Sequence, residues 1–429
     1  MATGSVATAG PLESLEHSVH EVRLPNGAIF LLLNQGAAPT VSTVLRFAVG
    51  GVEEDPGASG LAHFFEHLAF KGSPKVTATE LWRAYQRSGG LHLNANTSKD
   101  LTTYVVSLPS NRIELWAWID SDRVFHPTFQ EFDSERKVVI EERRQRIDNR
   151  PNGRLWEVFM EAAFGHDTPY AIPTIGSIPD LERLTVEQAS RFHQKFYCPD
   201  RLTGTLVGRF DVPEAEAIIR KYFSSVTTKA PPILKPGLFV PQHEPKKTTI
   251  EGNGGPSVLI GYHKPTLPNR DDYVFDMISE LLGGGRTSRL YQALVRNGKA
   301  ISMDVDNSVP GTRLHNLMVI SIDPNKGTSP DLVQKIIDQE IARLQTEPAT
   351  PEELQVVRKR LYSNILWSLE DNDSLASLLG YYQAVAGDWR YLTRYLDVIA
   401  AIGPQEIQAV AKKYLTPENR TIAVLLRKK

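Results

Sequence analysis

The sequence predicts an α+β fold built from two structurally related domains, each an α/β sandwich in which helices cover an antiparallel-rich sheet. Strand-like and helix-like segments mix without a regular strand–helix alternation, which argues against a doubly wound sheet. The chain has 429 residues, too many for one ordinary core. One helix–turn–strand pattern also occurs twice along it. These three observations together favour two related units.

The first elements follow from local patterns. Residues 19–34 alternate between apolar and polar side chains around Asn26-Gly27, the dipeptide most typical of a tight hairpin turn, and residues 42–51 form a further expected strand. After that strand, apolar residues recur at helical spacing. The later elements expected are helices over 59–70 and 79–88, the second with Thr79 as its cap, a hairpin over 91–109, and amphipathic helices over 111–125 and 131–146.

A repeat divides the chain in two. Residues 185–208 read TVEQASRFHQKFYCPDRLTGTLVG, and residues 403–426 read GPQEIQAVAKKYLTPENRTIAVLL. Both show an amphipathic helix, an aromatic residue, a proline turn and an apolar strand, although two ordinary units can converge on this pattern. A stretch rich in Pro and Lys lies between them and has the composition of a linker. We expect an N-terminal domain over 1–225, a linker over 226–250 and a related C-terminal domain over 251–429.

Composition and charge exclude several classes of function. A formal net charge of −2 and a pI near 6.6 give no electrostatic footprint for nucleic acid or an anionic membrane. No run approaches the roughly eighteen apolar residues that span a bilayer. The single cysteine, Cys198, excludes an intramolecular disulfide framework. The first residues have the pattern of neither a secretory signal nor a transit peptide. We therefore expect a cytoplasmic protein, or a periplasmic or organellar one if a presequence was removed.

The most specific motif is His63-Phe64-Phe65-Glu66-His67 in the N-terminal domain. On a helix, side chains four residues apart lie on one face, so both imidazoles can reach one tetrahedral Zn²⁺ ion. Glu66 is next to the second imidazole and can take a proton from a water molecule that the metal acidifies. The order His-x-x-Glu-His is the inverted form of the commoner zinc-peptidase motif. The C-terminal domain has no copy of it.

Chance produces this motif in roughly two of a hundred sequences of this length, and the alternative is a solvated helix face with two ordinary histidines. The small residues GASGLA before the helix and the neighbouring apolar residues favour the metal site. A catalytic zinc needs a third protein ligand, for which Glu135, Glu141 and Glu142 are candidates. Glu135 and Glu142 are two turns apart on one helix face, and Glu141 is rotated away by about 100°. One of the pair would bind the metal and the other would orient a histidine N–H.

The sequence resembles the pitrilysin/insulinase family of inverted-motif zinc peptidases, with the mitochondrial processing peptidase and its bacterial relatives as the nearest type. The matching stretches are GLAHFFEHLAFKGS, GGLHLNANTSKDLTTYVVSLP, ERKVVIEE, TPYAIPTIGS and LLGGGRTSRLYQAL, and they cover nearly the whole chain. The resemblance implies that His63 and His67 are zinc ligands and that Glu66 is the catalytic base. It also implies that Glu142 is the carboxylate ligand and Glu135 a supporting acid.

Members of this family bind peptide along an edge strand, and Asn94 and Ala95 match that strand. Strand addition suits a peptidase of broad side-chain tolerance, because main-chain hydrogen bonds carry the affinity. An ordinary turn or strand-end role is the alternative for Asn94. The resemblance further implies that the two related halves form one side of a clamshell, and that a second chain closes a chamber around unfolded peptides.

Active enzymes of the family carry an Arg and a Tyr seven residues apart in the second unit, where they bind the substrate carbonyl. Here the corresponding stretch reads VRNGKAISMDV, and Arg296 and Ser302 do not restore the pair. We therefore expect a hetero-oligomer in which a related subunit supplies the pair, with a homodimer as the alternative. The resemblance implies a zinc endopeptidase. The competing class is a non-catalytic scaffold or assembly subunit of the same fold.

Overall fold

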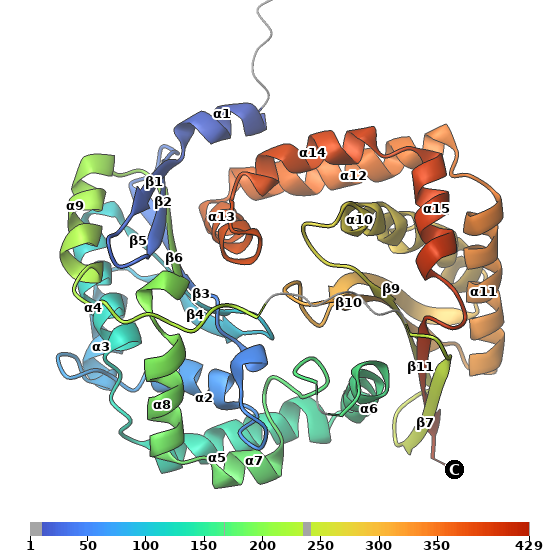
Figure 1. The fold of residues 1–429 in the computed structure, drawn as a ribbon, viewed down its shortest axis with the longest axis horizontal. Helices are drawn as coiled ribbons and strands as arrows, with labels where there is room; N and C mark the ends of the chain where they lie inside the picture. The colour runs from blue at the N-terminus through green and yellow to red at the C-terminus, as the bar shows by residue number, and fades with distance from the viewer. Residues whose placement is uncertain (1–10, 167, 235–241, 429) are drawn as a thin grey trace, which may run out of the picture.

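The computed structural model of the chain describes residues 11–166, 168–234 and 242–428 and contains two β-sheets, each with its own helices (Figure 1). The first sheet has six described strands in the order β1-β2-β6-β3-β5-β4. They are β1 (His20–Arg23), β2 (Ile29–Asn34), β3 (Thr40–Phe47), β4 (Leu91–Thr97), β5 (Thr102–Pro109) and β6 (Leu202–Gly208). We call the described residues up to 234 the N-terminal half and those from 242 onward the C-terminal half.

The second sheet repeats this arrangement in the order β7-β11-β8-β10-β9. Its strands are β7 (Lys246–Gly252), β8 (Ser257–Lys264), β9 (Ala300–Val309), β10 (Asn316–Pro324) and β11 (Arg420–Arg427). In both sheets, the strand from the sequence repeat (β6 or β11) pairs in parallel with one neighbour and antiparallel with the other. The remaining strands pair antiparallel. The predicted α+β fold with two related units is therefore confirmed.

Helices cover the sheets in both halves (Figure 1). The N-terminal half contains α1 (Pro11–Ser18), α2 (Leu61–Leu68), α3 (Ala78–Arg87), α4 (Ile113–Phe125), α5 (Phe132–Arg143), α6 (Gly153–Phe164), α7 (Ile178–Arg183), α8 (Val186–Phe196) and α9 (Val212–Phe223). The C-terminal half contains α10 (Arg270–Gly283), α11 (Pro330–Thr346), α12 (Pro351–Glu370), α13 (Asn372–Ala386), α14 (Tyr391–Ala401) and α15 (Pro404–Tyr414). Among the described residues, none of these helices has the length and apolarity needed to cross a membrane.

Each sheet also receives one helix from the other half. Leu155 and Phe159 of α6 pack against Leu317 and other apolar residues of the second sheet. In return, α13 packs on β3 and β6 of the first sheet, and its Leu375 and Leu379 belong to the core that includes Val44. A fully buried Leu or Phe contributes about 1.5–3 kcal/mol to the hydrophobic free energy of folding. This exchange therefore fastens the two halves together.

The described helices refine three sequence predictions. The predicted cap Thr79 is wrong, because Thr77 caps α3 and forms a capping box with Glu80, a reciprocal contact that Thr79 has no acid three residues later to make. The helix predicted over 131–146 is α-helical as far as Arg143 and continues as a π-helical turn, η3 (Arg144–Asp148). Within the linker predicted over 226–250, residues 235–241 lie outside the described part of the chain, and β7 begins at Lys246. The domain boundaries stay a prediction.

Candidate metal centre

Helix α2 is set in place by the residues before it. Gly60 has a φ of +89°, and a Cβ atom there would lie 2.6 Å from the carbonyl oxygen of Ile175. Only glycine fits such a position without strain. The carboxylate of Glu54 accepts hydrogen bonds from the backbone N–H groups of Gly60 and Ala62 at 3.0 and 2.8 Å. It satisfies otherwise unpaired donors at the positive end of the helix. Glu54 is not among the residues predicted from the sequence, where an acid shortly before the start of the helix was the only signal for it.

Three donor groups converge beside α2. Nε2 of His67 lies 3.3 Å from Oε2 of Glu142, and Nε2 of His63 lies 3.8 Å from the same oxygen. One ligand atom from each residue can be chosen so that all three lie within 4.8 Å of one another. Tetrahedral Zn²⁺ with ligand bonds of about 2.0–2.1 Å places its ligand atoms about 3.4 Å apart. The spacing therefore suits a zinc ion, and α5 supplies the third donor, Glu142.

Two buried atoms at this point have no hydrogen-bond partner among the described residues. They are Oε2 of Glu142 and Nδ1 of His63. The other carboxylate oxygen of Glu142 forms an ion pair of 2.8 Å with Arg146 in the π-helical turn. Apart from the two imidazoles, Oε2 of Glu142 has no partner in the described part of the chain, and a cation bound between the imidazoles would satisfy this buried oxygen. Two imidazoles and one carboxylate are also a donor set that zinc accepts. The residues present therefore fit Zn²⁺.

Glu135 supports the centre from behind His67. Its Oε1 lies 2.8 Å from Nδ1 of His67, and its Oε2 lies 2.6 Å from Nζ of Lys71. Burial raises the pKa of Glu135, but hydrogen bonds from His67 and Lys71 outweigh it and hold that pKa below its usual value. The contact fixes the ring so that Nε2 faces Glu142, as a carboxylate behind a metal-binding histidine does. The sequence spacing alone left open which acid would bind the metal and which would orient a histidine. In the structure Glu142 lies near Nε2 of both imidazoles, and Glu135 contacts Nδ1 on the other side of the His67 ring.

The charges around the two imidazoles differ. Burial, followed by the neighbouring His67, lowers the pKa of His63 to about 4. Burial also acts to lower the pKa of His67, but the carboxylates of Glu135 and Glu142 prevail and raise it to about 9. The two carboxylates therefore favour positive charge on His67, whereas burial disfavours it on His63.

Replacing Glu135 by glutamine is expected to weaken zinc affinity by about 10–100-fold without removing a ligand. Glutamine lacks the negative charge that Glu135 places beside Nδ1 of His67. Competition with a chromophoric chelator measures the dissociation constant. Glu141→Gln is the matched control, because Glu141 is 53% exposed and pairs with Arg144 rather than with the metal donors. Equal affinities for the two variants would contradict the supporting role of Glu135.

Glu66 lies next to the donors without joining them. It is buried, and its Oε2 accepts a hydrogen bond of 2.6 Å from Oγ1 of Thr97. Burial raises the pKa of Glu66, and the Thr97 contact acts in the opposite direction. A raised pKa brings a carboxylate closer to the neutral range in which a general base works best. Glu66 and both histidines line a cavity of about 890 Å³.

Asn94 and Ala95 lie on β4, which is the outermost strand of the first sheet. Both residues line the same cavity as the metal donors. One side of β4 pairs with β5, and no other described strand pairs with its second side. A free strand edge thus borders the candidate metal site, as strand addition of a peptide requires.

The C-terminal half contributes no donor to the cluster, and among the described residues no second group of three or more donors is found. Arg296 ends η5 (Tyr291–Arg296) and is hydrogen bonded to Gln292, while Ser302 on β9 donates to Asp323. The expected lack of an Arg/Tyr pair in this half stays a prediction.

Two family models match the chain. Residues 30–177 match the family described as Insulinase (Peptidase family M16), and residues 183–361 match the family described as Peptidase M16 inactive domain. The three candidate metal ligands and Glu66 all lie within the first match. The zinc protease PqqE of Helicobacter pylori is 27% identical over 387 residues, covering 88% of this chain and 86% of that protein. An uncharacterized zinc protease of Mycobacterium leprae is 27% identical over 406 residues, covering 91% and 88%.

Solved structures share the fold. A protease from Helicobacter pylori superimposes with a TM-score of 0.88 at 25% identity, over 95% of this chain and 99% of that one. The first half of the periplasmic protease PqqL from Escherichia coli gives a TM-score of 0.75 at 19% identity, over 95% and 92%. Against the whole PqqL chain the match covers 95% of this chain but only 47% of the other. The fold of this chain therefore also occurs as one half of a longer protein.

Proposed function

Because the chain belongs to the insulinase family of peptidases, we propose that it is a zinc-dependent endopeptidase acting on unfolded peptides. The observation that carries the proposal is the convergence of His63, His67 and Glu142 with Glu66 beside them. The names of the relatives, which call them zinc proteases, support the same conclusion.

Glu66 lies beside the three donors, where a carboxylate can exchange a proton with a water molecule. Bound between the three donors, Zn²⁺ would polarise the scissile carbonyl and lower the pKa of a water molecule towards about 7. Glu66 takes the proton of the attacking water and then passes it to the leaving amine, so the same carboxylate is base and acid in turn. Thr97 holds one oxygen of Glu66, which leaves the other oxygen available for the proton.

The substrate is proposed to be an extended peptide that pairs with the free edge of β4. Most backbone groups of a folded protein are already paired, whereas an unfolded peptide has them free to pair with that edge. A second unit, supplied by a related chain that carries the Arg/Tyr pair, would close the chamber, with a homodimer as the alternative. The match to one half of PqqL supports the idea that a fold of this kind works alongside a second unit.

Hydrolysis of a quenched fluorescent peptide tests the proposal. The chain is assayed with zinc, first alone and then with a related chain from the same genome that carries the Arg/Tyr pair. We expect full activity only on mixing, and a rate about 10²–10³-fold lower for the chain alone, the usual loss when an oxyanion donor is removed.

Full activity of the chain alone would contradict the heteromeric arrangement and favour the homodimer. Zinc binding without hydrolysis in either arm would contradict the peptidase and favour the non-catalytic assembly subunit. The match of residues 183–361 to a domain described as inactive keeps that second candidate in the test.

A further inference from the structure

The start of β4 is tied to the C-terminal half. Nδ1 of His92 lies 2.7 Å from Oδ2 of Asp373, in the first turn of α13. The other oxygen of Asp373 accepts a hydrogen bond from Ser107 on the neighbouring strand β5. His92 has a φ of +56°, an unusual conformation for histidine, and it lies where the β4–β5 register shifts between Leu91 and Asn94. An irregular strand end therefore rests on a helix that the other half contributes to this sheet.

The end of β4 is tied to the same half by a different loop. Asp100, in the turn that follows β4, accepts hydrogen bonds on Oδ2 from the backbone N–H groups of Thr312 and Arg313 at 2.6 and 3.1 Å. Its Oδ1 accepts the hydroxyl of Tyr170 at 3.0 Å, and that hydroxyl accepts the N–H of Leu314 at 2.9 Å. The loop between β9 and β10 thus closes onto the turn between β4 and β5.

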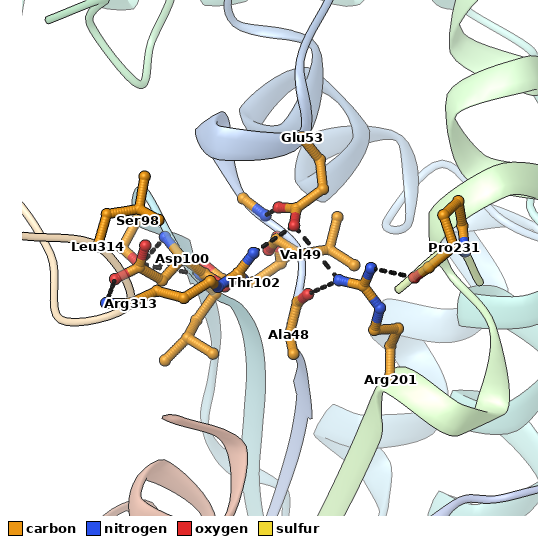
Figure 2. A network of polar contacts seen from close by, with 12 residues as sticks. Ala48, Val49, Glu53, Ser98, Asp100, Thr102, Arg201, Pro231, Arg313 and Leu314 are labelled. Atoms are coloured by element: carbon orange, nitrogen blue, oxygen red, sulfur yellow. Dashed lines mark hydrogen bonds and ion pairs between the residues drawn. The ribbon is translucent and has the colours of Figure 1, made fainter. Parts of the chain in front are cut away.

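Buried charges hold this loop in place (Figure 2). The guanidinium of Arg313 donates to the carboxylate of Glu53 and to the backbone carbonyl of Asp100. Glu53 also pairs with Arg201, which reaches the carbonyl oxygens of Ala48 and Pro231. All three charged side chains are less than 10% exposed. Figure 2 shows Arg313 and Arg201 meeting the same carboxylate from opposite sides, so moving the loop away from the turn would break one buried ion pair of Glu53.

Between its two ties, β4 reaches the reaction site. Thr97, its last residue, donates the hydrogen bond to Glu66. Asn94 and Ala95 face the cavity at the free edge. A shift of β4 would therefore move the peptide-binding edge and the contact of Glu66 together, and misplacement of about 1 Å is enough to impair a reaction.

We infer that the C-terminal half, which supplies no metal ligand, holds β4 at both ends in register with the metal centre, and that His92 and Asp100 are positioning residues for an extended peptide. This inference rests on the proposed peptidase function. It gives the metal-free half of the chain a role in substrate binding through the N-terminal sheet.

His92 is the residue to vary, because it is 72% exposed in its side chain, whereas replacing Asp100 or Arg313 would disturb buried charges. His92→Gly accepts the positive φ and removes the contact with Asp373. His92→Asn also tolerates the positive φ and places an N–H donor at the position of Nδ1. The difference between the two variants separates the effect of the His92–Asp373 contact from the effect of the backbone conformation.

The variants are assayed in the subunit composition that hydrolyses peptide, on a peptide long enough to extend along β4 and on a short one that spans only the scissile bond. His92→Gly is expected to raise KM for the long peptide by about 3–5-fold, the effect of losing one exposed hydrogen bond, and to leave the zinc content unchanged. KM for the short peptide should not change, and His92→Asn should restore the wild-type KM. Amide hydrogen exchange of residues 93–97 should be faster in His92→Gly and normal in His92→Asn.

His20→Gly is the matched control. His20 pairs with Glu216 at the same 2.7 Å distance, and it lies on β1 at the opposite edge of the same sheet. An unchanged KM and unchanged exchange in His92→Gly would overturn the inference, as would failure of His92→Asn to restore them. If the wild type hydrolyses neither peptide, the proposed function fails. The exchange measurement then still decides whether the tie holds β4.

Discussion

Replacing Glu66 by glutamine is expected to lower kcat by about 10²–10⁴-fold while the protein still binds one zinc ion per chain. The three donor atoms come from other residues, so the ion should remain. Glutamine has nearly the same shape and its amide oxygen can still accept the Thr97 hydroxyl, which at present donates to Oε2 of Glu66. The change therefore removes one property only, the ability to take a proton.

Metal analysis and turnover should be measured on the same preparation of the Glu66→Gln variant. Glu141→Gln serves as the control, because it removes a carboxylate that lines the same cavity but is half exposed, pairs with Arg144 and is not among the three donors. Hydrolysis retained in Glu66→Gln would exclude Glu66 as the base. Zinc lost from that variant would show instead that the carboxylate helps to hold the metal.

Replacing Glu142 by alanine is expected to abolish stoichiometric zinc binding and reduce hydrolysis to background. Catalytic zinc sites use three protein ligands, and only His63 and His67 would remain. Loss of the ion should also appear in stability. A ligand at about a hundred times its dissociation constant stabilises the folded state by about 2.7 kcal/mol, so added zinc should raise the Tm of the wild type but not of this variant.

The control for Glu142→Ala is Glu141→Ala, one residue away on the same helix. Glu141 is half exposed, pairs with Arg144 and is not among the three donors, so its loss should change neither zinc content nor the zinc-dependent rise in Tm. If both variants bind zinc as the wild type does, the metal is held elsewhere and the assignment of Glu142 is wrong.

Local patterns were enough to predict much of this molecule. A spacing of four residues on one helix places His63 and His67 side by side, and a spacing of seven places Glu135 and Glu142 on one face of α5. Strand periodicity and the Asn26-Gly27 turn likewise predicted the first hairpin, whose strands pair in antiparallel register. Such features depend on residues within two turns of helix or across one tight turn.

Contacts between distant parts of the chain could not be predicted in the same way. His92 and Asp373 are 281 positions apart, and nothing in either local sequence indicates the other. The sequence also gives no sign that α6 and α13 each cover the sheet of the other half, because an amphipathic helix does not show which sheet its apolar face will cover. Glu54 was missed for a smaller reason: its contact with the start of α2 spans a loop and follows no capping pattern.

The most direct test of the central claim is anomalous diffraction at the zinc edge from crystals of the zinc-loaded Glu66→Gln protein. One peak bounded by His63, His67 and Glu142, with the glutamine side chain beside it, is the predicted result. A peak at another place in the chain, or none at these three residues, would contradict the metal centre and the chemistry proposed for it.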